Sequence, residues 1–122
     1  MAVGKYQELK AWQAAMQLAE MAYLVSARFP KHQTYGLASQ LQRSAVSIPS
    51  NVAEGHARDS LREYLHHISI AMGSLAEVET QLLLAERLNY VEGEEMRTLG
   101  GLVEQTGMML RGLQKSLKAK TK

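Results

Sequence analysis

The chain contains no cysteine among its 122 residues, and this absence excludes several kinds of chemistry. Disulfide bridges, thiolate metal sites and thiol nucleophiles are impossible, and nothing indicates an oxidising compartment, so we expect a cytoplasmic protein. No apolar run approaches the ~20 residues of a membrane span. The amino-terminal stretch also lacks the charged and apolar regions of a signal peptide. We therefore expect neither export nor insertion into a membrane.

Acidic residues are missing from the last part of the chain, although the overall charge is only +2. The basic tail, residues 111–122, holds five cations and no acid: Arg111, Lys115, Lys118, Lys120 and Lys122. Such a tail suits nucleic acid or an acidic partner surface. It is also what a solvated helix end contains, because cations suit the negative end of the helix dipole.

Apolar residues recur every three or four positions along almost the whole sequence, which is typical of amphipathic helices. The pattern predicts a single domain, residues 1–122, with helices over roughly 5–28, 35–54, 60–87 and 93–118. Helices of this length joined by short connections favour an all-α fold, an antiparallel up-down-up-down four-helix bundle.

Local signals mark the ends of these helices. Pro30 cannot continue the first helix, and Gly55 is expected in the left-handed conformation just beyond the second. Ser60 and Glu63 have the spacing of a capping box, in which each side chain accepts a hydrogen bond from the backbone of the other. Asn89 is expected to end the third helix in the left-handed conformation.

The same periodicity predicts which side chains are buried. The expected buried face of the first helix holds Leu9, Trp12, Met16, Ala19 and Tyr23. That of the second holds Leu37, Leu41, Ala45, Ile48 and Val52. The fourth helix has the most regular heptad pattern, with Met96, Leu99, Val103, Thr106, Leu110, Leu113 and Leu117.

The stretch "SIPSNVAEG" places Pro49 inside the second predicted helix. A proline there removes one backbone hydrogen bond and its ring clashes with the carbonyl of Ala45, at a cost of ~3 kcal/mol. Because the apolar residues keep their phase through Pro49, we predict a kink and not a break.

A second, polar face runs along the same helix. At ~100° per residue, six polar residues fall within a sector of ~100° beside the apolar face: Gln40, Arg43, Ser44, Ser47, Asn51 and Glu54. Small hydroxyl and amide side chains allow another backbone to come close and exchange hydrogen bonds, which favours contact with another helix or subunit. The alternative is an ordinary solvent-exposed face.

Three motifs in this part of the chain, "YGL", "QLQRSAVSIPSNVAEG" and "AMGSLAEVETQL", closely resemble the bacterial four-helix-bundle proteins encoded in intervening sequences of large-subunit ribosomal RNA genes. The likeness is strong from Phe29 to Tyr90. This family is similar to the accessory variability protein of diversity-generating retroelements, a pentamer that works with a reverse transcriptase and RNA. The resemblance therefore implies a homopentamer with a role connected to nucleic acid.

The resemblance also implies a set of recurring polar positions. They correspond to Gln40, Arg43, Ser47, Asn51 and Glu54 in the second helix and to Gly73, Ser74 and Glu77 in the third. We expect Gly73 and Ser74 to permit close helix approach, and Glu77 or Glu54 to meet Arg43 in a paired network. Relatives often carry a second arginine where this chain has Gln42, so its basic surface is weaker than theirs.

No catalytic or cofactor-binding constellation is evident. Glu63 and His66 have the E-x-x-H spacing of bundle proteins that bind two metal ions, but such a site needs a second copy and further carboxylates, which the sequence lacks. Phosphate-binding loops and nucleophile motifs are also missing from the sequence. We expect a protein that is not an enzyme, with no metal or cofactor.

Two functions follow. In the first, an oligomer binds RNA or DNA without reading sequence, through Arg43, Arg58, Arg62, Arg111, Lys115 and Lys118. In the second, the chain is a structural or protein-interaction module with a protein partner. Cations that converge on one surface favour the first, whereas cations scattered among acids favour the second.

Overall fold

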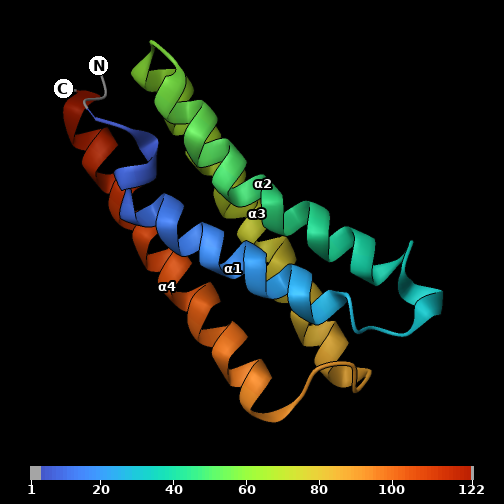
Figure 1. Ribbon diagram of the computed structural model, residues 1–122. Helices are drawn as coiled ribbons and strands as arrows, with labels where there is room; N and C mark the ends of the chain where they lie inside the picture. Colours follow the sequence, from blue (N-terminus) through green and yellow to red (C-terminus); the bar gives the residue numbers. More distant parts are fainter. Residues whose placement is uncertain (1–3, 122) are drawn as a thin grey trace.

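The computed structural model describes residues 4–121 and contains four long α-helices (Figure 1). They are α1 (Lys10–Ser26), α2 (Leu37–Ala57), α3 (Leu61–Arg87) and α4 (Gly93–Lys118), with short 3-10 turns at η1 (Tyr6–Glu8), η2 (Lys31–Gln33) and η3 (Ala119–Thr121). Residues 4–121 contain no β-strand. The prediction of an all-α chain with four helices is confirmed.

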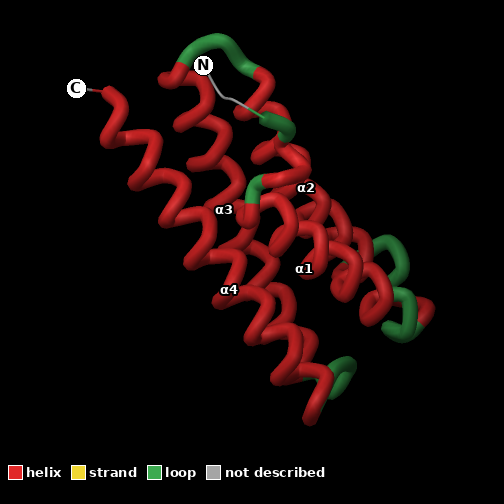
Figure 2. Tube along the Cα trace, turned by 60° about the vertical axis from the view of Figure 1, so that its left-hand side comes forward, coloured by secondary structure: helices red, strands yellow, loops and turns green. Residues whose placement is uncertain are grey.

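The four helices surround a common core. α1 packs against α2 and α4, and α3 also packs against α2 and α4, so each helix has two neighbours. In Figure 1 the chain turns back at each connection, and the described part of the chain begins and ends at the end of the bundle that holds the α2–α3 connection. Figure 2, from a second direction, shows the same order of helices. We call this end of the bundle the termini end. We call the opposite end, which holds the α1–α2 and α3–α4 connections, the loop end.

The buried face of α1 differs from the predicted one. Met16 and Tyr23 were expected in the core but are 43% and 45% exposed. The core side of α1 is instead a stripe rich in alanine: Ala11, Ala14, Ala15, Leu18, Ala22 and Val25. The prediction followed the large apolar side chains, whereas small side chains allow α1 to lie close to its neighbours.

The predicted faces of α2 and α4 agree with the structure. All five predicted residues of α2 are buried. In α4 five of the seven heptad residues are buried, and Met96 and Leu113 pack partly buried against the core. These two helices have large apolar side chains at helical spacing, so periodicity alone identified their core sides.

α2 continues through Pro49 without a break and bends near its middle in Figure 1. It ends at Ala57, so the expectation that Gly55 lies beyond its end is wrong. Gly55 is buried inside the helix and does not have a positive φ. A Cβ atom at Gly55 would lie 2.9 Å from His67 Cβ and 2.9 Å from Tyr64 Cδ1. The glycine is therefore required by the close approach of α2 and α3, not by a turn.

The predicted ends of α3 are confirmed, but of the two capping-box hydrogen bonds only the one accepted by Ser60 is present among the described residues. The backbone N–H of Glu63 donates to Ser60 Oγ over 3.2 Å, while the Glu63 carboxylate pairs with Arg58. At the other end Asn89 has a φ of 64°. The N–H of Tyr90 donates to Ala85 O and that of Asn89 to Glu86 O, the two bonds of a Schellman motif.

By length and composition alone, α3 is apolar enough to cross a membrane, which the sequence reading did not anticipate. A core helix of a bundle has the same length and composition, and α3 packs against both α2 and α4. Within the bundle, 33% of the most apolar stretch of α3 is buried.

Candidate functional site

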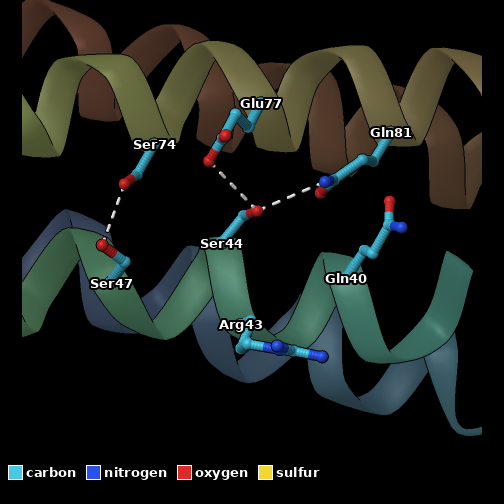
Figure 3. Close-up of a pocket in the computed structure, with 7 residues that line it drawn as sticks. All are labelled: Gln40, Arg43, Ser44, Ser47, Ser74, Glu77 and Gln81. Atoms are coloured by element: carbon cyan, nitrogen blue, oxygen red, sulfur yellow. Dashed lines mark hydrogen bonds between the residues drawn. The ribbon is translucent and has the colours of Figure 1, made fainter. Parts of the chain in front are cut away.

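Polar side chains line the contact between α2 and α3, and we call this row the polar seam. It contains Ser44, Ser47 and Asn51 from α2, and His67, Ser74, Glu77 and Gln81 from α3. Residues later in α2 contact residues earlier in α3, as expected for neighbouring helices between which the chain turns back. Figure 3 shows the half of the polar seam nearer the loop end.

Two serines anchor this half of the polar seam. Gln81 Nε2 donates to Ser44 Oγ over 3.2 Å, and Ser44 Oγ donates to Glu77 Oε1 over 3.3 Å. Ser47 and Ser74 share a hydrogen bond of 2.9 Å between their hydroxyl oxygens. Both Ser44 and Ser74 are buried, so these bonds replace the water that the hydroxyls lose on folding.

A surface hollow of about 470 Å³ opens over these side chains and is also lined by Gln40 and Arg43. Within the described residues, Gln81 Oε1 is buried and has no hydrogen-bond partner. A buried acceptor without a partner costs about 1–3 kcal/mol. The polar seam therefore contains one buried acceptor that has no partner within the described chain.

The other half of the polar seam is a chain of bonds that reaches the termini end. Asn51 Nδ2 donates to the backbone oxygen and to the hydroxyl of Ser47, at 2.8 and 3.0 Å. This leaves Asn51 Oδ1 as an acceptor for His67 Nδ1, 2.9 Å away, so Nδ1 of His67 carries a proton. His67 Nε2 lies 3.8 Å from Glu54 Oε2, and Arg58 Nη2 donates to the same carboxylate over 2.6 Å.

These charges affect the titration of Glu54 and Arg58. The hydrogen bond from Arg58, and then the charge of His67, lower the pKa of Glu54 below its ordinary value of 4.5. The same carboxylate raises the pKa of the Arg58 guanidinium. Arg58 also pairs with Glu63 at 3.4 Å, so two acids compensate this cation.

The expected pairing of Arg43 with Glu77 or Glu54 is wrong. The Arg43 guanidinium donates to Ser39 Oγ over 3.2 Å, and in Figure 3 it extends along α2 and away from Glu77. Glu54 is paired with Arg58. Among residues 4–121, no ion pair involves Arg43 or Glu77. Two opposite charges on this side of the bundle therefore have no counter-charge within the described chain.

Gly73 also differs from expectation. It is exposed, and no atom lies within 4 Å of where its Cβ would be, so Gly73 does not mediate close helix approach within the chain. Sequence reasoning missed His67 and Gln81 as members of the polar seam. Their spacing contained a signal, because His67, Ser74 and Gln81 repeat every seven residues and so share one helix face.

Cations form a second surface on α4. Arg111, Lys115 and Lys118 are exposed and spaced at i, i+4 and i+7, so they share one flank, which we call the basic stripe. Leu75 of α3 lies beside Gly107, one turn before Arg111, which places the basic stripe on the flank that faces α3. The same flank carries Glu104 nearer the middle of α4.

The other predicted cations, Arg62, Arg43 and Arg58, lie in three different places. Arg62 is exposed on the first turn of α3, and the start of α3 and the end of α4 both lie at the termini end (Figure 1). Arg43 lies over the polar seam, and Arg58 is compensated by acids. In the part of the chain that the structure describes, Arg62, Arg111 and Lys115 form no ion pair. Lys122 of the basic tail lies outside the described residues.

A metal site is not evident in the structure. Among residues 4–121 there is no group of three or more His, Asp or Glu side chains that could hold an ion. Glu63 of the E-x-x-H pair donates its backbone N–H to Ser60 Oγ, and its carboxylate pairs with Arg58.

Comparisons with known proteins agree with the fold. A model of the protein family described as 23S rRNA-intervening sequence protein matches residues 7–112, which confirms the resemblance inferred from the motifs. The chain is also similar to a crystal structure from Bacteroides thetaiotaomicron VPI-5482, described as a protein with unknown function from the S23 ribosomal protein family. The two share a TM-score of 0.79 and 20% identity, over 86% of this chain and 95% of that chain. No curated protein matches the chain.

Proposed function

This chain belongs to the 23S rRNA-intervening sequence protein family, and we propose that it is a non-enzymatic, oligomeric bundle that binds nucleic acid without reading its sequence. The observation that carries this proposal is the basic stripe on α4, together with Arg62 at the same end of the bundle. These cations are exposed, and Arg62, Arg111 and Lys115 form no ion pair within residues 4–121.

Neutralisation of phosphates is the chemistry that such a surface supplies. Each phosphate contact releases condensed counterions, so affinity falls steeply with salt, by a log-log slope of roughly 0.7 to 0.9 per contact. Contacts to phosphates position a protein but carry no sequence information. Three stripe cations and Arg62 allow up to about four contacts per chain, a slope of roughly −3 to −4.

Assembly is the second part of the proposal. We infer that the antiparallel bundle forms a homo-oligomer, a pentamer by the family resemblance, and that it works in the cytoplasm. The face over the polar seam supports assembly, because Arg43 and Glu77 line a surface hollow there and have no counter-charge in the described chain. A neighbouring copy can supply the missing partners, and several copies would multiply the cations available to one nucleic acid.

The same face supports an alternative, a protein-interaction module with no role in nucleic-acid binding. A partner protein that carries an acid opposite Arg43 and a base opposite Glu77 would satisfy both charges. The alternative predicts no dependence of function on Arg62 or Lys115. The two proposals therefore differ in which surface a mutation must alter.

Copurification from the native host tests the function. We expect nucleic acid to copurify with the wild-type protein and to disappear after nuclease treatment. We expect much less nucleic acid to copurify with the variant Arg62→Gln/Lys115→Gln. The control is Arg97→Gln, which removes a cation that is exposed on α4 but already paired with Glu94. Equal nucleic acid in all three proteins, or none in the wild type, would favour the protein-interaction module.

Light scattering tests assembly. The proposal predicts a mass that is a multiple of the 13.6 kDa chain at micromolar concentration, reduced by Arg43→Glu. A monomeric wild-type protein would contradict the assembly and leave the nucleic-acid proposal to stand on the basic stripe of a single chain.

A further inference from the structure

α3 carries a second regular stripe of residues on a face that the bundle does not cover. The stripe contains Ile70, Gly73, Glu77, Thr80 and Leu84, which follow one another in steps of three and four, and we call it the outer stripe. Steps of this kind place residues on one side of a helix, as in the seam of a coiled coil. All five residues are exposed, Ile70 at 39% and Leu84 at 47%. α3 therefore has the spacing for helix packing on its outside as well as in the core.

The outer stripe lies in a part of the molecule that is poor in charge. Only 33% of the most apolar stretch of α3 is buried, and the helix has no Asp, Glu, Lys or Arg from Tyr64 to Ala76. The neighbouring α2 contains only Arg43 and Glu54, whereas α4 contains seven such residues. A helix face in contact with water is normally rich in charged side chains. The outer stripe thus has the composition of a surface that is covered by protein.

The two small residues of the outer stripe also fit a contact with another helix. Gly73 lies inside α3 with no atom within 4 Å of where its Cβ would be and without a positive φ, so nothing within the described chain requires a glycine there. A glycine is less favourable than alanine inside a helix, but it allows another backbone to come close. Thr80 Oγ1 donates to Ala76 O over 2.8 Å, so this hydroxyl needs no acceptor from outside.

A second surface hollow, of about 380 Å³, lies along the outer stripe between α3 and α2. Leu84 lines it from α3 and Leu37 lines it from α2. It shares Glu77 and Gln81 with the hollow over the polar seam, so the two hollows adjoin. Side chains of a partner that packs on the outer stripe can enter both.

We propose that a second copy of the chain covers the outer stripe, with Glu77 of one copy paired with Arg43 of the next. This inference rests on the assembly in the proposed function and assigns its contact surface. Charge complementarity identifies the partner as a second copy. Arg43 donates to Ser39 and Glu77 accepts from Ser44, but neither has a counter-charge among residues 4–121, and another copy supplies both. A two-fold pair and a ring both allow this pairing across each contact.

Two glycine variants test the contact surface. Gly73→Gln adds a neutral side chain to the outer stripe, where no atom of its own chain is in the way, and should weaken assembly by about tenfold through overpacking of the contact. Gly101→Gln is the matched control, because Gly101 is an exposed helical glycine of α4 that also has no atom within 4 Å of its Cβ position. Light scattering over a dilution series measures assembly, and circular dichroism checks that both variants are folded.

Charge variants test the pairing between copies. Arg43→Glu and Glu77→Arg each place like charges across the contact, so each should weaken assembly by about tenfold or more. An equimolar mixture of the two variants should assemble more tightly than either alone, because each chain then meets the opposite charge on the other. A pairing of Arg43 with Glu77 inside one chain predicts no gain on mixing.

Three results would overturn this contact surface while leaving the homo-oligomer of the proposed function intact. They are unchanged assembly of Gly73→Gln, an equal loss of assembly in Gly101→Gln, and a mixture of the charge variants that assembles no more tightly than its components. A wild-type protein that is monomeric at micromolar concentration would overturn the inference together with the assembly, but not the binding of nucleic acid at the basic stripe.

Discussion

Gly55→Ala is expected to destabilise the bundle, although alanine is the better helix former. A methyl group at this position would lie 2.9 Å from His67 Cβ and Tyr64 Cδ1, and 3.2 Å from the backbone oxygen of Tyr64. His67 Cβ and the Tyr64 carbonyl cannot rotate away, so α2 and α3 must separate by a few tenths of an ångström. Overpacking of this kind costs about 1–3 kcal/mol, against a gain of about 1 kcal/mol in helix propensity.

Gly100→Ala provides the matched control. Gly100 also lies within a helix, but no atom is within 4 Å of where its Cβ would be, so only the propensity gain of about 1 kcal/mol remains. The free energy of unfolding should therefore differ between the two variants by about 1–3 kcal/mol. Urea unfolding followed by far-ultraviolet circular dichroism at one protein concentration measures this. A Gly55→Ala protein as stable as Gly100→Ala would refute the close approach of α2 and α3.

Three further changes test individual features. Pro49→Ala should keep full helicity and raise the free energy of unfolding by about 1 kcal/mol, because it restores a backbone donor; a loss of helicity measured by circular dichroism would contradict the continuous helix. The lowered pKa of Glu54 means that its ion pair stabilises the fold at neutral pH and that this stabilisation is lost as pH falls below 4.5. A titration of the Glu54 carboxyl by NMR should give a midpoint below 4.5. Arg58→Gln should move this midpoint upward. Burial raises the pKa of Tyr64, so stability should fall only as pH rises above 10, and ultraviolet titration of Tyr64→Phe should lack one late-ionising phenol.

Features that depend on neighbouring residues were readable from the sequence. Ser60 and Asn89 act through their own backbone and through residues a few positions away, so short patterns identified both ends of α3. Large apolar side chains at helical spacing likewise revealed the buried sides of α2 and α4. In α1 the same reasoning failed, because its buried stripe is mostly alanine and its larger side chains, such as Met16, lie outside.

Features that depend on contact between helices were harder to predict. The register of α2 against α3 decides that Gly55 lies against Tyr64 and that Ser44 reaches Gln81, and no local pattern specifies that register. The predicted pairing of Arg43 with Glu77 is wrong because the Arg43 side chain extends along α2 to Ser39, and the sequence does not specify this rotamer. By contrast, Glu54 lies in the last turn of α2 and Arg58 directly follows the helix, four residues later, so their ion pair was open to prediction.

The salt dependence of nucleic-acid binding tests the proposed function most directly. The log-log slope for a duplex is expected to be roughly −3 to −4 per chain, and Arg62→Gln/Lys115→Gln should reduce its magnitude by about 1.8, since two contacts are lost. Arg97→Gln should leave the slope unchanged, because its cation is paired with Glu94 at the other end of α4. A slope near zero in the wild type, or the same slope in all three proteins, would contradict phosphate binding at the basic stripe.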